Sequence, residues 1–233
     1  IVVSEVDGAA SFTQSVFSEQ RGDIAEFTIS LSNVESVDVE IGTAAGQSDI
    51  GYGATLLDVN DTDGDGEVTL ELNTFAPHQG NNPDAITVTS GDDEIEGDVT
   101  TTGTATALDA GTYDVNVSIN NQEEDVATLS LLELSADGFT VLTGPPENDI
   151  EDASATSEFD AFEAAGNLTA TSSIASEDIV VHKIEASGLG GAIANARSSG
   201  DDDEEAFEAL LNLDDVNLNI TQTDASTGAN QDN

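Results

Sequence analysis

The sequence contains no cysteine, methionine or tryptophan, and only 3 of its 233 residues are lysine or arginine. Without cysteine, the chain can form neither a disulfide framework nor a thiolate metal site, and it has no thiol nucleophile. Without clustered cations, it cannot displace counterions from phosphates, which excludes nucleic acid as a partner and disfavours anionic lipid. No apolar run approaches the ~18 residues that a transmembrane helix requires, so we expect no direct membrane insertion.

Acidic residues dominate the charge of the chain: 48 Asp and Glu give a formal net charge of −45. A charge of this size opposes compaction and is typical of disordered chains. Here, however, polar and acidic residues alternate with apolar ones, as in residues 27–31 (FTISL) and 68–72 (VTLEL), which is the pattern of half-buried strands. At molar salt the Debye length falls to about 3 Å, so surface carboxylates are screened from one another. The composition therefore predicts a folded halophilic protein whose folding depends on salt.

Strand-sized apolar segments recur along the first part of the chain, separated by clusters of Gly, Asp, Asn and Ser. They are Ile1–Val6, Ile24–Ser30, Ser36–Ile41, Ala54–Val59, Glu67–Leu72, Ala85–Thr89, Thr112–Ile119 and Asp125–Glu133. This spacing predicts a mainly β chain with a β-sandwich. Residues 143–147 (TGPPE) interrupt the pattern and predict a boundary between a domain of residues 1–144 and a smaller β-rich domain of residues 145–233.

One or two short helices are expected in the C-terminal part. Residues 157–165 (SEFDAFEAA) contain helix formers after a possible capping serine, and residues 202–211 begin with acids that suit the positive end of a helix dipole. Strand-like segments lie between and after these helices, at Asn167–Ser172, Asp178–Ala186 and Val216–Thr223.

The sharpest local motif is an acidic turn in which oxygen-bearing side chains alternate. Asp61, Asp63, Asp65 and Glu67 occupy positions 1, 3, 5 and 7 of a D-x-D-x-D-G run, which lets alternate carboxylates converge on one hard cation such as Ca²⁺. Position 12, where an EF-hand has glutamate, is Leu72, so this is not an EF-hand. Asp-Gly repeats also make solvated hairpin turns. A calcium site and a plain turn both remain open.

Other motifs bear on modification and catalysis. N-x-[ST] sequons at Asn60, Asn116, Asn167 and Asn219 are candidate acceptors of N-linked glycans in an exported chain. No nucleophile elbow, H-E-x-x-H motif or phosphate-binding loop occurs in the sequence, and His78 and His182 are the only histidines. We therefore expect no enzyme activity.

A set of segments, in this order, resembles the repeat domains of haloarchaeal S-layer and related cell-surface glycoproteins. They are residues 22–31 (GDIAEFTISL), 37–42 (VDVEIG), 51–53 (GYG), 59–70 (VNDTDGDGEVTL), 108–115 (LDAGTYDV), 125–131 (DVATLSL) and 175–191 (ASEDIVVHKIEASGLGG). The resemblance implies immunoglobulin-like β-sandwich domains. It also implies an extracellular, glycosylated, non-enzymatic protein that assembles at the cell surface with divalent cations. The chain lacks an initiator Met, and it lacks the Thr-rich stalk and the hydrophobic sorting tail that are typical of this family. Two interpretations are therefore open: the chain is a fragment of a longer protein, or it is a short relative of the family.

The apolar N-terminal segment suggests a route to self-assembly. Ile1, Val2, Val3 and Val6 can complete a sheet of the next subunit, and such a head-to-tail contact generates a filament or lattice. The same residues can equally form the first strand of their own domain. The leading hypothesis is a self-assembling structural protein of the cell surface. The alternative is a calcium-dependent adhesin or carbohydrate-binding module on that surface, which predicts a monomer with a saturable ligand.

Overall fold

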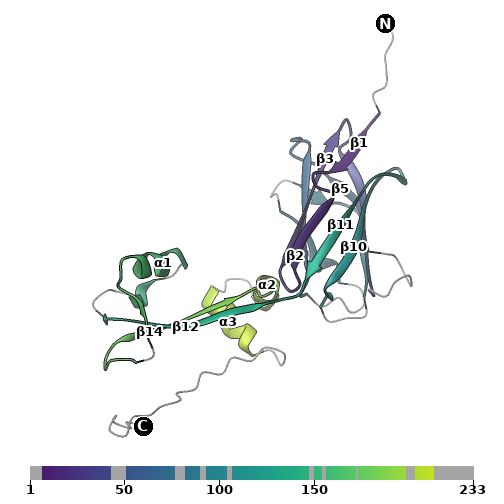
Figure 1. The fold of residues 1–233 in the computed structure, drawn as a ribbon. Coiled ribbons are helices and arrows are strands. Elements are labelled where there is room, and N and C mark those ends of the chain that lie inside the picture. The colour runs from purple at the N-terminus through teal and green to yellow at the C-terminus, as the bar shows by residue number, and fades with distance from the viewer. Residues whose placement is uncertain are drawn as a thin grey trace.

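The computed structural model describes residues 7–42, 51–76, 82–89, 93–103, 107–146, 150–153, 156–171, 173–197 and 203–212. The described chain forms a two-sheet β-sandwich followed by a smaller unit in which a long β-ribbon is accompanied by three short helices (Figure 1). The ribbon extends away from one end of the sandwich, and β1 lies toward the other end (Figure 1).

The sandwich consists of one sheet of four strands and one larger sheet. The first sheet has the order β1 (Ala9–Phe12), β3 (Ile24–Ser32), β6 (Glu67–Asn73) and β7 (Ile86–Val88). The second has the order β2 (Val16–Gln20), β11 (Gln122–Leu132), β10 (Gly111–Ile119), β4 (Ser36–Gly42), β5 (Tyr52–Asn60) and β8 (Glu94–Ile95), and β9 (Val99–Gly103) also pairs with β5. β2 pairs parallel to β11, whereas the other pairs are antiparallel.

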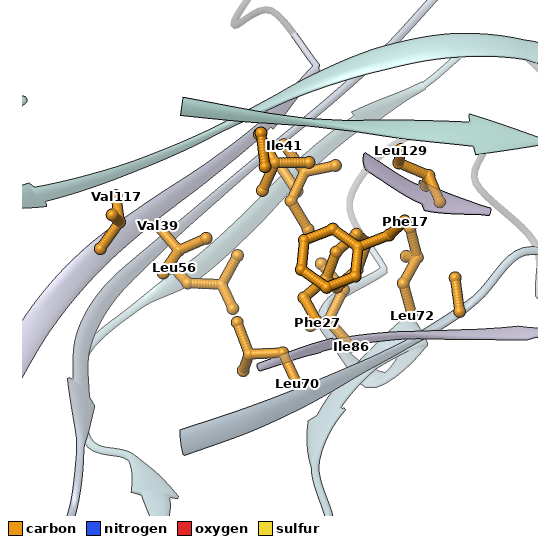
Figure 2. Packing of buried hydrophobic residues seen from close by; sticks show 14 of the residues in the cluster. Phe17, Phe27, Val39, Ile41, Leu56, Leu70, Leu72, Ile86, Val117 and Leu129 are labelled. Atoms are coloured by element: carbon orange, nitrogen blue, oxygen red, sulfur yellow. The ribbon is translucent and has the colours of Figure 1, made fainter. Parts of the chain in front are cut away.

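The core of the sandwich is filled by alternate residues of these strands. Leu70 and Leu72 of β6 point inward, and so do Phe27 of β3 and Val39 of β4 (Figure 2). Phe17 of β2 contacts Phe27 edge-on, with ring centroids 5.4 Å apart. Successive side chains of a strand point to opposite faces of the sheet. The apolar residues of the alternating sequence pattern are therefore the buried ones, and the polar residues face the solvent.

A buried tyrosine closes one corner of the sandwich. The hydroxyl of Tyr113, near the start of β10, donates a hydrogen bond to the backbone carbonyl of Asp109 at 2.7 Å. This is the tyrosine corner of immunoglobulin-type sandwiches, in which the hydroxyl binds backbone a few residues upstream. Burial raises the pKa of Tyr113 to about 12, with the Asp109 carboxylate adding to the rise, so the phenol stays protonated and keeps donating at neutral pH.

The second unit is built on the pairing of β12 (Ala136–Gly144) with β14 (Ile179–Ala186), to which the short β13 (Thr169–Ala170) adds. One face of this sheet packs against α1 (Thr156–Ala164) in a small cluster. Its members are Leu142, Ile150, Leu168, Phe159, Phe162, Ile179 and Val181. α2 (Gly190–Ala196) and α3 (Asp203–Leu211) pack against each other, and 3-10 turns occupy Pro83–Ala85 and Ile150–Asp152.

A close backbone contact joins the two units. The carboxylate of Asp23 accepts the N–H groups of Gly188, at 2.8 Å, and Gly190, at 2.6 Å, and the Gly191 N–H binds the Gly22 carbonyl at 2.8 Å. A Cβ atom at Gly22 would overlap the carbonyl oxygen of Gly188, and Gly188 has a φ of +82°. These positions therefore require glycine, because any side chain would separate the two units.

The predicted mainly β fold with short C-terminal helices is confirmed. Each strand predicted between residues 24 and 133 has a counterpart among the described strands, and the expected helices correspond to α1 and α3. The strand expected at Asn167–Ser172 is shorter, since β13 holds only two residues. The segments Ile1–Val6 and Val216–Thr223 lie outside the described residues. β12, which precedes the expected boundary near residue 145, pairs with β14, which follows it.

The strands that sequence patterns missed are short or rich in small polar residues. β1, β2, β8 and β9 have at most five residues each. β12 has the sequence ADGFTVLTG, in which apolar and polar residues do not alternate strictly, and α2 begins with two glycines, which are poor helix formers.

Replacing Tyr113 by Phe tests the tyrosine corner. We expect Tyr113→Phe to lower the free energy of unfolding by about 1 kcal/mol, because it removes one buried hydrogen bond while keeping the ring. Urea unfolding at molar NaCl measures the change. The neighbouring exposed substitution Thr112→Ser is the control, and equal stabilities of the two variants would contradict a structural role for the hydroxyl.

Candidate functional site

The acidic turn connects β5 to β6 and is organised by Asp61. One carboxylate oxygen of Asp61 accepts the Gly64 N–H at 2.7 Å, and the other accepts the Gly66 N–H at 2.9 Å. Both glycines have positive φ angles, +75° and +86°, which glycine adopts without strain. The Asp61 N–H binds the carbonyl of Glu35, so the side chain is held in the turn and is only 8% exposed.

A third carboxylate reaches this turn from a distant part of the sequence. β8 pairs with the end of β5, with Asn60 opposite Glu94, and this pairing brings Asp93 beside the turn. Asp93 is buried, and its carboxylate accepts the Thr62 N–H at 3.2 Å. Carboxylate oxygens of Asp61, Asp63 and Asp93 all lie within 4.8 Å of one another. Three converging carboxylates are the hard oxygen ligands that Ca²⁺ prefers.

The two remaining predicted ligands point elsewhere in this structure. The Asp65 carboxylate accepts the Glu67 N–H at 2.8 Å, and the Glu67 side chain accepts a long hydrogen bond from the Ser30 hydroxyl at 3.5 Å. Sequence spacing alone did not identify Asp93, because Asp93 is brought to the turn by strand pairing between β5 and β8 rather than by its position in the motif.

The crowding of carboxylates affects the titration of Asp63. A hydrogen bond from the Asp65 N–H lowers the pKa of Asp63, but desolvation and the charges of Asp65, Asp93 and Asp61 together raise it by more. The net result is a pKa above the ordinary value of an aspartate. Such mutual repulsion would be relieved by a cation placed between the carboxylates.

The sequons occupy different settings. Asn60 ends β5, and its side-chain amide donates to the Glu96 carboxylate at 2.9 Å. Asn116 lies in the middle of β10, between Glu40 of β4 and Val126 of β11. Asn167 follows α1 in a turn in which its N–H binds the Phe162 carbonyl. Asn219 lies outside the described residues.

The remaining residues considered in the sequence analysis are the two histidines and the N-terminal segment expected to mediate assembly. His182 lies on β14 and stacks on Phe139 of β12, with ring centroids 5.6 Å apart and an angle of 18° between the rings. His78 and the residues Ile1, Val2, Val3 and Val6 lie outside the described residues. Among the helices of the described part, none combines the length and hydropathy needed to cross a bilayer.

Comparisons with known proteins identify relatives along nearly the whole chain. A family described as a domain of unknown function (DUF7827) matches residues 2–120. A cell surface glycoprotein of Haloferax gibbonsii is 35% identical over 228 residues, which cover 97% of this chain and 24% of that protein. Cell surface glycoprotein 1 of Haloarcula hispanica is 34% identical over 243 residues, covering 97% of this chain and 25% of that protein. Cell surface glycoprotein 2 of the same organism is 29% identical over 252 residues, with coverages of 97% and 26%. The chain thus spans about a quarter of the length of the curated relatives it matches.

The interaction between Asp63 and Asp93 can be tested without any ligand. The substitution Asp93→Asn keeps an oxygen that can accept the Thr62 N–H and removes one negative charge. We expect the pKa of Asp63 to fall, because one of the charges that raise it is gone. Titration of the Asp63 carboxyl carbon by NMR measures the shift. Asp114→Asn on the outer face of β10 is the control, and an unaltered Asp63 pKa in Asp93→Asn would show that the two carboxylates do not interact.

Proposed function

We propose that this chain, which belongs to the family described as DUF7827 and is similar over 97% of its length to haloarchaeal cell surface glycoproteins, is a non-enzymatic structural protein of the extracellular surface that assembles with copies of itself. The assembly is an S-layer-like array or an extracellular filament, stabilised by high salt and divalent cations. The observation that carries the proposal is the similarity over 97% of the chain to proteins named cell surface glycoproteins.

The charge of the molecule supports assembly in brine. Copies that each carry a net charge of −45 repel one another in dilute buffer. At molar salt, screening over about 3 Å removes most of this repulsion beyond direct contact. Divalent cations add to the effect, because one ion can neutralise carboxylates from two surfaces.

Within this proposal the acidic turn binds Ca²⁺. The converging carboxylates are those of Asp61, Asp63 and Asp93. The exposed side chains of Asp65 and Glu67 belong to the same turn and can become additional Ca²⁺ ligands if they rearrange. The role of the ion is to fix the connection between β5 and β6 by offsetting the repulsion that raises the pKa of Asp63. This is a structural role and needs no exchangeable ligand position.

Glycans and strand donation are the two remaining parts of the proposal. The sequons at Asn60, Asn116, Asn167 and Asn219 are the candidate attachment points, and Asn167 is the one that lies in a turn after a helix. Donation of the segment containing Ile1, Val2, Val3 and Val6 to the next copy would join subunits through main-chain hydrogen bonds, which surface charge disturbs little.

Calcium binding is tested by isothermal titration calorimetry at molar NaCl. We expect the pair of substitutions Asp63→Ala and Asp93→Asn to weaken Ca²⁺ binding at least tenfold, because they remove two of three converging carboxylates. The pair Glu26→Ala and Asp114→Ala changes the net charge equally on exposed strand positions and serves as the control. Equal binding by both double variants would refute the site.

Self-assembly is tested by size-exclusion chromatography and negative-stain electron microscopy at molar NaCl, with and without Ca²⁺. We expect the full chain to form polymers and a variant lacking residues 1–6 to remain a folded monomer. Polymers formed by the truncated variant would exclude strand donation by this segment. A full chain that stays monomeric in every condition would contradict the structural role and favour an adhesin or carbohydrate-binding module.

A further inference from the structure

Each of the three sequons in the described residues has a buried residue at its centre. Val117 is 0% exposed, Leu168 is 1% exposed and Asp61 is 8% exposed. An enzyme that glycosylates a sequon has to reach both the asparagine amide and the hydroxyl group two residues later. It therefore has to enclose the backbone that lies between these two side chains, and the fold restricts access to this backbone.

The sequon at Asn116 lies in a strand that is paired on both sides. Within β10, Asn116 is opposite Val126 of β11 and Glu40 of β4, and Figure 1 shows β10 running beside β11. Cross-strand neighbours of this kind have Cβ atoms about 5 Å apart. The flanking residues Val115 and Val117 belong to the core of the sandwich. Freeing this sequon therefore requires β10 to separate from both neighbouring strands, which amounts to unfolding the sandwich.

The sequon at Asn167 is held by fewer contacts. The N–H groups of Asn167 and Leu168 both bind the carbonyl of Phe162, at 2.9 and 3.2 Å. Thr169 begins β13, whose two residues pair with β12. Leu168 packs in the small cluster beside α1 and not in the core of the sandwich. Because a segment with few contacts opens at a lower free energy than a central strand, this sequon can be exposed while the sandwich stays folded.

The folded structure accepts a glycan on Asn116 once the sugar is attached. Since Val115 and Val117 point into the core, Asn116 points to the outer face of the large sheet. A glycan on its amide nitrogen then projects away from the core and displaces no buried side chain. Val126, opposite Asn116, is an aliphatic residue that is 46% exposed, and a sugar ring at Asn116 can cover it. The fold is thus compatible with the product but not with the reaction.

We propose that Asn116 receives its glycan only on the unfolded chain, before β10 pairs with β4 and β11, whereas Asn167 stays open to modification after folding. This inference rests on the proposed glycosylation and adds the order in which modification and folding occur. The sheets of the sandwich join strands that are distant in the sequence, such as β2 and β11, and topologies of this kind fold in milliseconds to seconds. The fraction of chains glycosylated at Asn116 therefore depends on how long the chain stays unfolded.

The chemistry of the transfer explains why the paired sheet prevents it. The donor is an oligosaccharide linked through its anomeric carbon to a lipid phosphate. The Asn116 amide nitrogen forms a bond to that carbon and gives one proton to a base of the enzyme. The bond from the carbon to the phosphate oxygen breaks, and the lipid phosphate leaves with its electron pair.

The neighbouring strands surround this reaction with negative charge when β10 is paired. Glu40 lies opposite Asn116, and Ser118 lies between Asp38 of β4 and Glu123 of β11. An anionic donor that approaches the outer face therefore meets three carboxylates beside the sequon. In the unfolded chain these carboxylates belong to distant segments and no longer flank the asparagine.

Glycosylation in vitro at molar NaCl tests the order of the two steps. The full chain is produced in bacteria that lack the modifying enzyme and is then incubated with haloarchaeal membranes, which supply the enzyme and the lipid-linked oligosaccharide. Leu129→Asp places a carboxylate at a fully buried position of β11 and is expected to keep the sandwich unfolded. Leu132→Asp, at a residue of the same strand that is 48% exposed, adds the same charge and should leave the sandwich folded. Circular dichroism verifies both states.

Mass spectrometry of glycopeptides measures the modification of each asparagine. We expect Asn116 to be glycosylated at least tenfold more in Leu129→Asp than in Leu132→Asp or the unsubstituted chain, and Asn167 to be glycosylated in all three. Equal glycosylation of Asn116 in the folded and unfolded chains would overturn the proposed order. Glycosylation of Asn167 alone, in every variant, would overturn Asn116 as an acceptor.

A peptide of residues 112–122, which is too short to fold, is the positive control for the membranes. If this peptide is glycosylated but no asparagine of any full-length chain is, both this inference and the glycosylation on which it rests are wrong.

Amide hydrogen exchange of the folded, unmodified chain gives an independent test at molar NaCl. The amides of residues 116–118 should exchange as slowly as that of Leu70, which lies in the central strand β6 and reports global unfolding. The amides of residues 167–169 should exchange at least tenfold faster, because their segment opens locally. Equal protection of the two sequons would overturn the distinction between them, whatever their glycosylation.

Discussion

Mutual repulsion between carboxylates is the constraint that the rest of this structure accommodates. With 48 acids and 3 lysines or arginines, the folded chain brings many like charges together, and the burial of apolar side chains opposes their repulsion. In the strands of the sandwich, apolar and polar residues alternate. The apolar side chains therefore point into one continuous core, and the acidic side chains point to the outer faces of the sheets. Two of the three lysine and arginine residues each lie near two acids: Arg21 near Asp109 and Glu133, and Lys183 near Asp160 and Glu163.

The sequence predicted those parts of the fold in which a local pattern and the tertiary structure agree. Strands such as β3, β6 and β10 have strict alternation, and they lie in the middle of the sheets, where one face is buried. β12 and α2 escaped prediction because their sequences are rich in glycine and small polar residues, so their structure depends on the partners they pair or pack with. The segment LDAGTYDV contributed only to the family resemblance, and the hydrogen bond from Tyr113 to Asp109 was not inferred from it.

In the candidate metal site, too, the sequence predicted the residues that lie close together in the chain but not the residue that strand pairing brings to them. The spacing of Asp61 and Asp63 was sufficient to predict that their carboxylates approach each other, since both belong to one short turn. Asp93 could not be found in this way, because only the pairing of β8 with β5 places it there. Conversely, Asp65 and Glu67 fit the spacing but use their carboxylates within the turn or across to Ser30. The D-x-D-x-D-G motif thus predicts the turn, whereas the pairing of β8 with β5 determines which carboxylates converge there.

The junction of main-chain groups at Gly22, Gly188 and Gly191 has a mechanical consequence. Side chains that bridge two bodies can change rotamer and let the bodies swing, whereas here carbonyl and amide groups meet directly and the Asp23 carboxylate binds two amides at once. Bending at this point would require several of these bonds to stretch together. The junction therefore resists a swing of the β12–β14 ribbon against the sandwich more than a contact made by side chains alone would.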